Sequence, residues 1–458
     1  MTGQEANRND FRNSASFSER THVSRNRYFN LAVTEQSAGD FAAARIHYSQ
    51  ALRFNPSHVG ALNNLSDLLR MQGRSALAWQ CADRFIEAGG DPRGLEIRFA
   101  KIADECNRPN DARYWFGRAA EHDSSPALRW ESAMQQLRDE EFSQGWENYE
   151  ARREIFDHHT LGLVNYPESE WDGVAKPCAS LLLHKEQGLG DMIMFAILLG
   201  NADLAGMDVH LAVQPPLARL FAANFPWAKV WASSSTAEAP DASGQQWYAG
   251  AGPFDSQLPL ASLGRVAQID FADAPKAYIS ADEADTHVWA SRMEMLAGNM
   301  PSARIKAGLV IAARPSGPDI KGGVNGADKT LDPTAAALLA IDGVRWFGLH
   351  NGPTSHILSE VPDLDLIDCS PWLFDLADTA AVIANLDVVV AVDTAVAHLA
   401  GAMGKKVILM LQHRPDWRWG RCKSASHWYP DVTILQQEIQ GDWWSVVRKA
   451  RQHIEEMR

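Results

Sequence analysis

Cysteine is scarce in this sequence. The 458 residues include five cysteines, at positions 81, 106, 178, 369 and 422. No two of them form a Cys-x-x-Cys pair, so the spacing indicates neither a zinc knot nor a disulfide framework. Widely separated thiols are typical of proteins kept in a reducing compartment, and we expect a cytoplasmic protein.

Long hydrophobic runs are missing as well. No stretch reaches the roughly 18–20 apolar residues of a membrane-spanning helix. The N-terminal stretch MTGQEANRNDFRNSASFSER is polar and lacks the apolar centre of a signal peptide. We therefore expect no membrane span, and we expect residues 1–24 to form a disordered tail.

An excess of positive charge is also absent. Lysine and arginine number 43 against 57 aspartates and glutamates, which gives a net charge of −14. This balance argues against a general binder of nucleic acid or of anionic membranes. The chain is 46% hydrophobic and 22% charged, as globular proteins are. Because 458 residues are too many for one hydrophobic core, we expect several domains.

The sequence does contain a repeat, within residues 25–158. Helical stretches recur there with a period of 34 residues and resemble tetratricopeptide repeats. The matching positions are a turn-forming residue and, five residues later, an alanine: Gly39, Gly73 and Asn107, then Ala44, Ala78 and Ala112. A fourth unit, LRDEEFSQGWENYEARRE, continues in the same phase. Such helix pairs form either a concave surface for a peptide or partner, or a plain dimerisation or spacer domain.

After Pro167 the pattern changes to apolar β-type runs that alternate with helical stretches. Continuous apolar strands are typical of a parallel sheet buried on both faces. A polar, proline-containing stretch near residue 284 divides this part into two predicted lobes, 159–283 and 284–435, and a terminal helix over 436–458 follows. The predicted strands are SLLLHKE (180–186), DVHLAVQ (208–214), AKVWAS (228–233), IKAGLVIAA (305–313), VRWFGLH (344–350), LDVVVAV (386–392) and KVILML (406–411).

The stretch AVDTAVAHLAGAMG (391–404) predicts a helix that begins where a buried strand ends. Asp393 and Thr394 are good N-cap residues. A helix N-terminus at the carboxyl edge of a parallel sheet offers free N–H groups to a phosphate. His398, one turn later, would add a charge-assisted hydrogen bond when protonated. The alternative is a capped helix with a histidine in the core.

A second strand–turn–helix stretch is LLLHKEQGLGDMIMFAILL (181–199). Gly188 and Gly190 permit a tight turn and the close approach of a ligand to the backbone. Asp191 opens the helix, either as a carboxylate base or simply as a capping residue. If both stretches face one cleft, a base and a phosphate-binding helix lie on its two sides, which suits transfer from an activated donor.

Aromatic and basic residues crowd the stretch HRPDWRWGRCKSASHWYPD (413–431). The tryptophans bound either a base or sugar ring, or pack the lobes together. The arginines either approach phosphate or lie in solvent. The residues concerned are Trp417, Trp419 and Trp428, with Arg414, Arg418 and Arg421.

These stretches together resemble a family: bacterial tetratricopeptide-repeat glycosyltransferases whose catalytic part is related to the heptosyltransferases of glycosyltransferase family 9. EQGLGD, DTAVAHLAGA and DWRW are specific in combination. The other matching stretches are GWENYEARRE (145–154), EWDG (170–173), FDSQLPLASLG (254–264), DKTLDPTAAALLAIDGVRWFGLH (328–350), WYPD (428–431) and GDWWSVV (441–447).

The resemblance implies an α + α/β fold class, with tetratricopeptide-like helical repeats followed by a GT-B fold of two Rossmann-like lobes. The N-terminal lobe would hold the acceptor and the C-terminal lobe the nucleotide sugar. Asp191 is then the expected catalytic base. The expected donor-binding residues are Gly188, Gly190, Arg314, Lys329, Asp393, Thr394, Ala395 and His398.

One stretch departs from the family pattern. Relatives usually follow the first strand of the second lobe with a Trp-Ala/Ser-Gly-Asn turn. Here that place reads LVIAARPSGPDIKGG (309–323), a longer loop without the Gly-Asn step. Either Arg314 substitutes as a phosphate partner or the donor site is altered. Lys329 is either a phosphate contact or a solvated loop residue.

The predicted function is an inverting, metal-independent glycosyltransferase that needs no cofactor beyond its nucleotide-sugar substrate. Its acceptor is a protein or surface glycan recruited by the helical repeats. The alternative is a non-catalytic repeat scaffold with a degenerate transferase fold, which the altered 309–323 loop favours. An oxidoreductase is disfavoured, because GLGD lacks the three-glycine dinucleotide fingerprint.

Overall fold

A computed structural model describes residues 26–161, 163, 166–200, 202–233, 253–267, 275–298, 303–313, 329–350, 352–361, 364–421 and 424–458. The predicted tail (1–24), Arg314 and most of the 309–323 loop lie outside these residues. The chain divides into two compact units, residues 1–135 and 136–458. Within the described residues no helix is both long and apolar enough to cross a bilayer.

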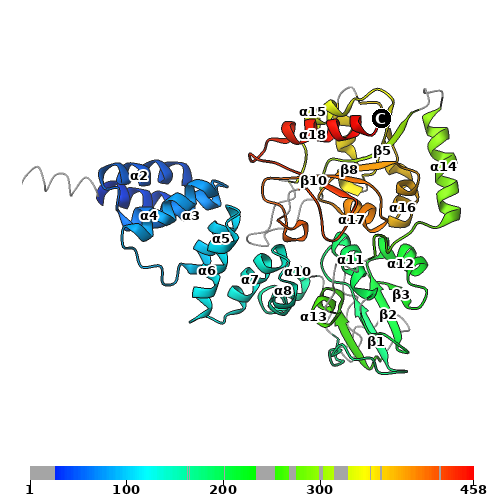
Figure 1. The fold of residues 1–458 in the computed structure, drawn as a ribbon, viewed down its shortest axis with the longest axis horizontal. Coiled ribbons are helices and arrows are strands. Elements are labelled where there is room, and N and C mark those ends of the chain that lie inside the picture. The colour runs from blue at the N-terminus through cyan, green and yellow to red at the C-terminus, as the bar shows by residue number, and fades with distance from the viewer. Residues whose placement is uncertain are drawn as a thin grey trace, which may run out of the picture. The chain divides into compact units, whose positions relative to one another are not determined.

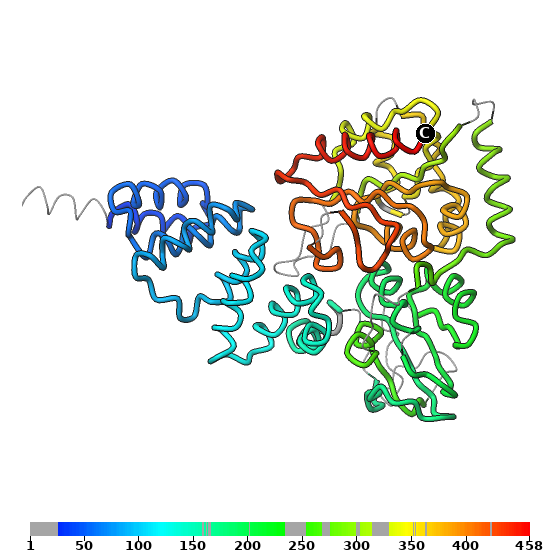
Figure 2. The backbone as a smooth tube through the Cα atoms, viewed as in Figure 1, coloured from blue at the N-terminus to red at the C-terminus, as the bar shows by residue number. Residues whose placement is uncertain are grey.

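The first unit consists of helices that pack against their neighbours in sequence (Figure 1; Figure 2). It begins with a helix over residues 26–37. The helices that follow are α2 (Phe41–Phe54), α3 (Val59–Met71), α4 (Ser75–Glu87), α5 (Glu96–Glu105), α6 (Pro109–Ala120) and α7 (Pro126–Arg138).

The backbone explains the 34-residue period. Gly39, Gly73 and Asn107 all adopt a positive φ, at 82°, 77° and 55°. Glycine takes this left-handed conformation without strain, and asparagine tolerates it better than most residues. The alanines five residues later are fully buried: Ala44, Ala78 and Ala112. Each repeat thus combines a left-handed turn with a small residue in a packed position, which confirms the tetratricopeptide-like prediction.

The second unit begins with short helices that precede its first sheet: α8 (Phe142–Tyr149), α9 (Arg152–Ile155) and α10 (His158–Leu161). The predicted helical domain extends to residue 158, whereas these helices lie in the second unit. Trp146, Tyr149 and Arg152 are buried there. The ring of Trp146 lies where a β-carbon on Gly264 would stand, so that position accepts only glycine without rearrangement. The fourth helical segment is thereby packed into the α/β part of the chain.

The first sheet is parallel with strand order β3-β2-β1-β4. Its strands are β1 (Ser180–His184), β2 (Asp208–Val213), β3 (Lys229–Ala232) and β4 (Ser256–Pro259). Its helical elements are α11 (Leu189–Phe195), η1 (Ala196–Gly200), η2 (Pro215–Leu217), α12 (Ala218–Asn224), η3 (Leu260–Ser262) and α13 (Leu263–Ala267). The order reverses beside β1, which places the loop after β1 at a topological switch point.

The second sheet is parallel with strand order β10-β9-β8-β5-β6-β7. Its strands are β5 (Ile305–Val310), β6 (Val344–Gly348), β7 (Leu366–Asp368), β8 (Val388–Val392), β9 (Val407–Leu411) and β10 (Val432–Gln436). Its helical elements are α14 (Glu283–Ala297), α15 (Pro333–Ala336), η4 (Ala337–Leu339), η5 (Gly352–Glu360), η6 (Ser370–Trp372), α16 (Leu376–Ala384), α17 (Ala395–Ala402), η7 (Trp417–Trp419) and α18 (Trp443–Glu456).

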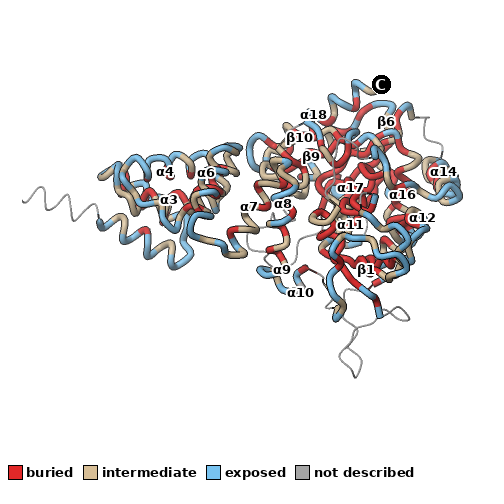
Figure 3. The backbone as a smooth tube through the Cα atoms, turned by 60° about the horizontal axis from the view of Figure 1, so that its bottom comes forward, coloured by how far each residue is buried: buried red, intermediate tan, exposed pale blue. Residues whose placement is uncertain are grey.

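This strand order is that of a Rossmann fold, with its switch point between β5 and β8. Strand β8 is buried along its whole length, as a central strand covered on both faces should be. Buried residues also fill the neighbouring α17 and β9 (Figure 3). Two Rossmann-like lobes in one unit make up a GT-B fold. The predicted α + α/β fold class is confirmed.

Candidate active site

Helices α11 and α17 begin at the switch points of the two lobes and contact each other (Figure 1). The contact is close at Gly190. A β-carbon there would lie 2.8 Å from Cδ2 of His398 and 3.4 Å from Cα of Ala395. The structure therefore brings the two predicted motif stretches together, with glycine required where the helices touch.

Asp191 lies in the first turn of α11 and both of its carboxylate oxygens are engaged. Oδ2 accepts a hydrogen bond from the backbone N–H of Gly188 at 2.9 Å. Oδ1 forms an ion pair with the guanidinium of Arg418. The Asp191 side chain is 20% exposed. It caps the helix and also faces solvent, so the role of Asp191 as a base stays a prediction.

Arg418, from η7 in the second lobe, connects Asp191 to a small charged network. Its Nη1 lies 2.6 Å from Oδ1 of Asp416, and its Nη2 donates to Oε1 of Gln187 at 2.9 Å. Burial by itself lowers the pKa of Arg418, but the charges of Asp191 and Asp416 raise it well above the usual range. Burial would raise the pKa of Asp416, yet Arg418 and Lys329 outweigh burial and hold it at about 2.

Lys329 and Asp393 form a second ion pair at the same edge, with Nζ 2.5 Å from Oδ2. Asp393 is 7% exposed. Burial lowers the pKa of Lys329, but the negative charges of Asp393 and Asp416 outweigh burial and raise it. Lys329 is thus a charged, partly exposed group beside the predicted phosphate site, and it is already in an ion pair with Asp393.

Thr394 is the N-cap of α17, but its side chain does not cap the helix. Its hydroxyl donates to the carbonyl oxygen of Val392 at 3.1 Å. The first-turn N–H groups, which begin at Ala395, therefore receive no side-chain acceptor from the N-cap residue. Such a terminus suits an anion, and anion binding there stays a prediction.

His398 is buried, and this changes its expected chemistry. Its Nδ1 lies 2.9 Å from the hydroxyl oxygen of Tyr429, and its ring stacks on Trp419 at 4.7 Å. Burial lowers the pKa of His398 to about 4, against the opposing charges of Asp393 and Asp191. The imidazole is therefore neutral at pH 7. The charge-assisted hydrogen bond to phosphate that the sequence suggested would require protonated His398, which burial disfavours.

The tryptophans of 413–431 pack inside the second unit. Trp417, Trp419 and Trp428 are 3%, 1% and 2% exposed. Trp146 makes edge contacts with Trp417 and Trp428, with ring centroids 5.8 and 6.4 Å apart. These tryptophans therefore pack inside the protein, which is one of the two alternatives that the sequence left open. They do not present a face to a base or sugar.

Arg152 braces the loop that leads to Asp191, and the sequence offers no local signal for it. Its Nε lies 2.5 Å from Oε1 of Glu186 and its Nη2 lies 2.8 Å from Oε2. Both side chains are fully buried. Gln187 also donates to the hydroxyl of Tyr149 at 2.8 Å. The α8–α9 segment thus positions the turn that carries the candidate base.

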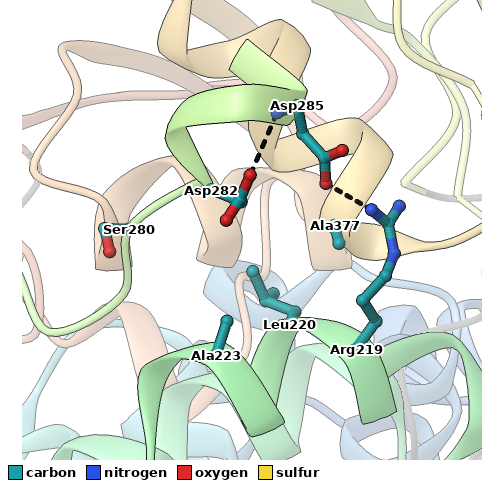
Figure 4. A pocket seen from close by; sticks show the side chains of 7 residues that line it. All are labelled: Arg219, Leu220, Ala223, Ser280, Asp282, Asp285 and Ala377. Atoms are coloured by element: carbon teal, nitrogen blue, oxygen red, sulfur yellow. Dashed lines mark hydrogen bonds and ion pairs between the residues drawn. The ribbon is translucent and has the colours of Figure 1, made fainter.

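The two lobes also touch at α12 and α16, away from the predicted site. Arg219 of α12 pairs with Asp285 of α14 and with Asp375 and Asp378 of α16. A pocket of about 300 Å³ opens beside this cluster (Figure 4). None of its lining residues belongs to the predicted site. The described residues contain no group of three or more His, Cys, Asp or Glu that could hold a metal ion.

Comparison with known families adds a decisive observation. The model of glycosyltransferase family 9 (heptosyltransferase) matches residues 373–427. Over this segment the chain is similar to glycosyltransferase family 9. This segment runs through α16, β8, α17 and η7, so it includes both Asp393 and Arg418. The chain is accordingly a glycosyltransferase, an enzyme that transfers a sugar to an acceptor.

Similarity also extends to one curated protein and to solved structures. Protein FlbA of Caulobacter vibrioides is 25% identical to this chain over an alignment of 487 residues, gaps included. The alignment covers 91% of this chain and 74% of that protein. A family 9 glycosyltransferase of Veillonella parvula is 12% identical over 62% of this chain and 92% of its own, with a TM-score of 0.41. Escherichia coli heptosyltransferase WaaC with ADP is 14% identical over 61% of this chain and 100% of its own, with a TM-score of 0.40.

Proposed function

We propose that this glycosyltransferase transfers a sugar from a nucleotide-sugar donor to a hydroxyl of a protein or surface-glycan acceptor, with inversion and without a metal ion. The observation that carries this proposal is the contact between α11 and α17. It brings a partly exposed carboxylate, Asp191, beside an uncapped helix N-terminus and the cation Lys329.

The chemistry is a single displacement. The acceptor oxygen attacks the anomeric carbon from the face opposite the nucleotide, and its proton passes to the Asp191 carboxylate. The bond between the anomeric carbon and the phosphate oxygen breaks, and its electron pair leaves with the nucleotide. One displacement inverts the configuration at the anomeric carbon.

The charge that develops on the departing phosphate needs fixed donors. The first-turn N–H groups of α17 supply dipoles, and Lys329 supplies a full positive charge. Cations from the protein perform here the role that a divalent metal takes in other transferases, which supports the metal-independent proposal. The donor-binding set would be Gly188, Gly190, Arg314, Lys329, Asp393, Thr394, Ala395 and His398, of which His398 acts in its neutral form.

The helical unit would recruit the acceptor. Tetratricopeptide-like repeats bind partners through exposed side chains of their helices. The first unit exposes large apolar side chains that a protein partner could cover: Leu31, Val33, Phe41, Ile46, Phe54, Met71, Leu77, Ile86 and Tyr114. We place the reaction in the cytoplasm, where thiols stay reduced, because none of the four described cysteines is in a disulfide bond.

A non-catalytic scaffold is the second candidate, and one observation favours it. The charged groups of the described site are already paired with each other, Asp191 with Arg418 and Lys329 with Asp393. A degenerate transferase that binds no donor would keep such pairs permanently.

A nucleotide panel separates the two candidates. The melting temperature of the full chain is measured with nucleoside mono- and diphosphates of each base, and donor turnover is followed by mass spectrometry. Binding to the folded state raises the melting temperature, and the stabilisation grows with the logarithm of ligand concentration over Kd. The proposal expects a rise with at least one nucleotide and transfer from its sugar ester. No shift with any nucleotide, and no turnover, would favour the scaffold.

A further inference from the structure

The guanidinium of Arg418 is shared between the two lobes. On its own lobe it pairs with Asp416, and its charge lies over the ring of Trp417, 4.7 Å from the centroid. On the other lobe it contacts Asp191 and Gln187. A guanidinium is always charged and binds carboxylate and phosphate oxygens in the same planar geometry. A donor phosphate at this edge would therefore compete with Asp191 for the same group.

While Asp191 stays in this pair, each of its carboxylate oxygens already has a partner. One of its oxygens accepts from Gly188 N–H and the other faces Arg418. An acceptor hydroxyl needs a carboxylate oxygen within hydrogen-bond reach for its proton. In the structure the guanidinium of Arg418 thus occupies a position beside Asp191 that an acceptor hydroxyl would need.

The two carboxylates around Arg418 are not equally displaceable. Asp416 lies two residues away on the same lobe and accepts from the backbone N–H of Arg418 as well, at 3.1 Å. Asp191 reaches Arg418 from the other lobe. In addition, Nε of Arg418 is buried and has no hydrogen-bond partner within the described residues. An incoming phosphate would displace Asp191 and leave Arg418 anchored by Asp416.

We infer that Arg418 exchanges Asp191 for the donor phosphate, so that donor binding releases the base. This rests on the proposed function and adds a residue and an order of events to it. Arg418 is a donor-binding residue, and Asp191 is available to the acceptor only when the donor occupies the site. The consequence is ordered addition, with donor before acceptor.

The test is a double-mutant cycle on nucleotide affinity. The nucleotide with the largest thermal shift is titrated calorimetrically into the wild type, Asp191→Asn, Arg418→Gln and the double variant. Removing the competing carboxylate should tighten nucleotide binding by about fivefold or more. That gain should vanish in the Arg418→Gln background, because the two residues then no longer interact.

Matched variants separate this exchange from general electrostatics and from misfolding. Arg219→Gln breaks another ion pair, that with Asp285 (Figure 4), and should leave nucleotide affinity unchanged. Arg418→Lys keeps the charge without the planar geometry and should show a smaller gain from Asp191→Asn. It also keeps the cycle measurable if Arg418→Gln fails to fold.

The possible results are distinct. Equal affinity of wild type and Asp191→Asn, or an equal gain with and without Arg418, overturns the exchange while nucleotide binding still supports the transferase. If no nucleotide binds the wild type, the exchange and the proposed function fall together.

Discussion

The two contacts between the lobes use the same chemistry at different depths. At α11 and α17, Arg418 reaches Asp191 with 12% of its side chain exposed, beside a packed glycine. At α12 and α16, Arg219 reaches three aspartates with 44% of its side chain exposed. Charges interact more strongly where water is excluded, whereas exposed pairs are screened. The comparison indicates that small substitutions at the α11–α17 contact have large effects, whereas substitutions at the α12–α16 contact have small ones.

The largest expected effect is on catalysis at the first contact. Asp191→Asn should lower turnover by roughly 10²–10⁴-fold, because the amide cannot accept the acceptor proton. The amide oxygen still accepts from Gly188 N–H and Arg418 keeps its pair with Asp416, so the helix cap and the position of Arg418 should be preserved. Steady-state turnover is the measurement, and Asp203→Asn, at an exposed position of the same lobe, is the control. Normal turnover in Asp191→Asn would leave Asp191 as a helix cap alone.

The next effect is steric. Gly190→Ala places a methyl group 2.8 Å from the buried His398 ring, which is held by its stack on Trp419. Overpacking of this kind costs about 1–3 kcal/mol of unfolding free energy. Gly200→Ala is the control, since a β-carbon there meets nothing within 4 Å. Urea denaturation of both variants decides, and equal stability of the two would mean that the α11–α17 contact is loose.

The third effect is a pH dependence at the first contact. Burial lowers the pKa of His398 to about 4, below its value near 6.5 in an unfolded chain. The unfolded state therefore takes up the proton first, so the His398 contribution is intact above pH 6.5 and is lost as the pH falls toward 4. Its share is roughly 1–2 kcal/mol between pH 7 and pH 5.

This third effect is measured as the free energy of unfolding of His398→Gln at pH 7 and pH 5. The variant should lose less stability than the wild type over that range. His453→Gln, at an exposed position of α18, should behave like the wild type. If His398→Gln kept the full acid sensitivity, His398 would be more accessible to protons than its burial indicates.

The smallest effect is expected at the second contact. Arg219→Gln should cost at most about 1 kcal/mol of unfolding free energy, because water screens ion pairs of an exposed side chain. The cost should shrink further at high salt, where the screening length falls. Denaturation at low and high ionic strength tests this. A salt-independent loss well above that value would show that the α12–α16 cluster behaves as a buried network.

The sequence by itself determined the repeats, the strands and the places where the motifs begin. These depend on local patterns: a left-handed turn every 34 residues, continuous apolar runs, and glycine or capping residues that directly follow a strand. A helix that follows a parallel strand starts at the carboxyl edge of the sheet. The residues adjacent in sequence to Asp191 and Asp393 were therefore enough to place both aspartates at such an edge.

Only the tertiary structure decided which partner each of these residues meets. The pairs Asp191–Arg418 and Arg152–Glu186 join distant parts of the chain, and no local pattern encodes them. The neutral state of His398 likewise depends on burial against Trp419 and Tyr429. Electrostatic behaviour follows from the surroundings of a group in space, and those surroundings exist only once the lobes have packed.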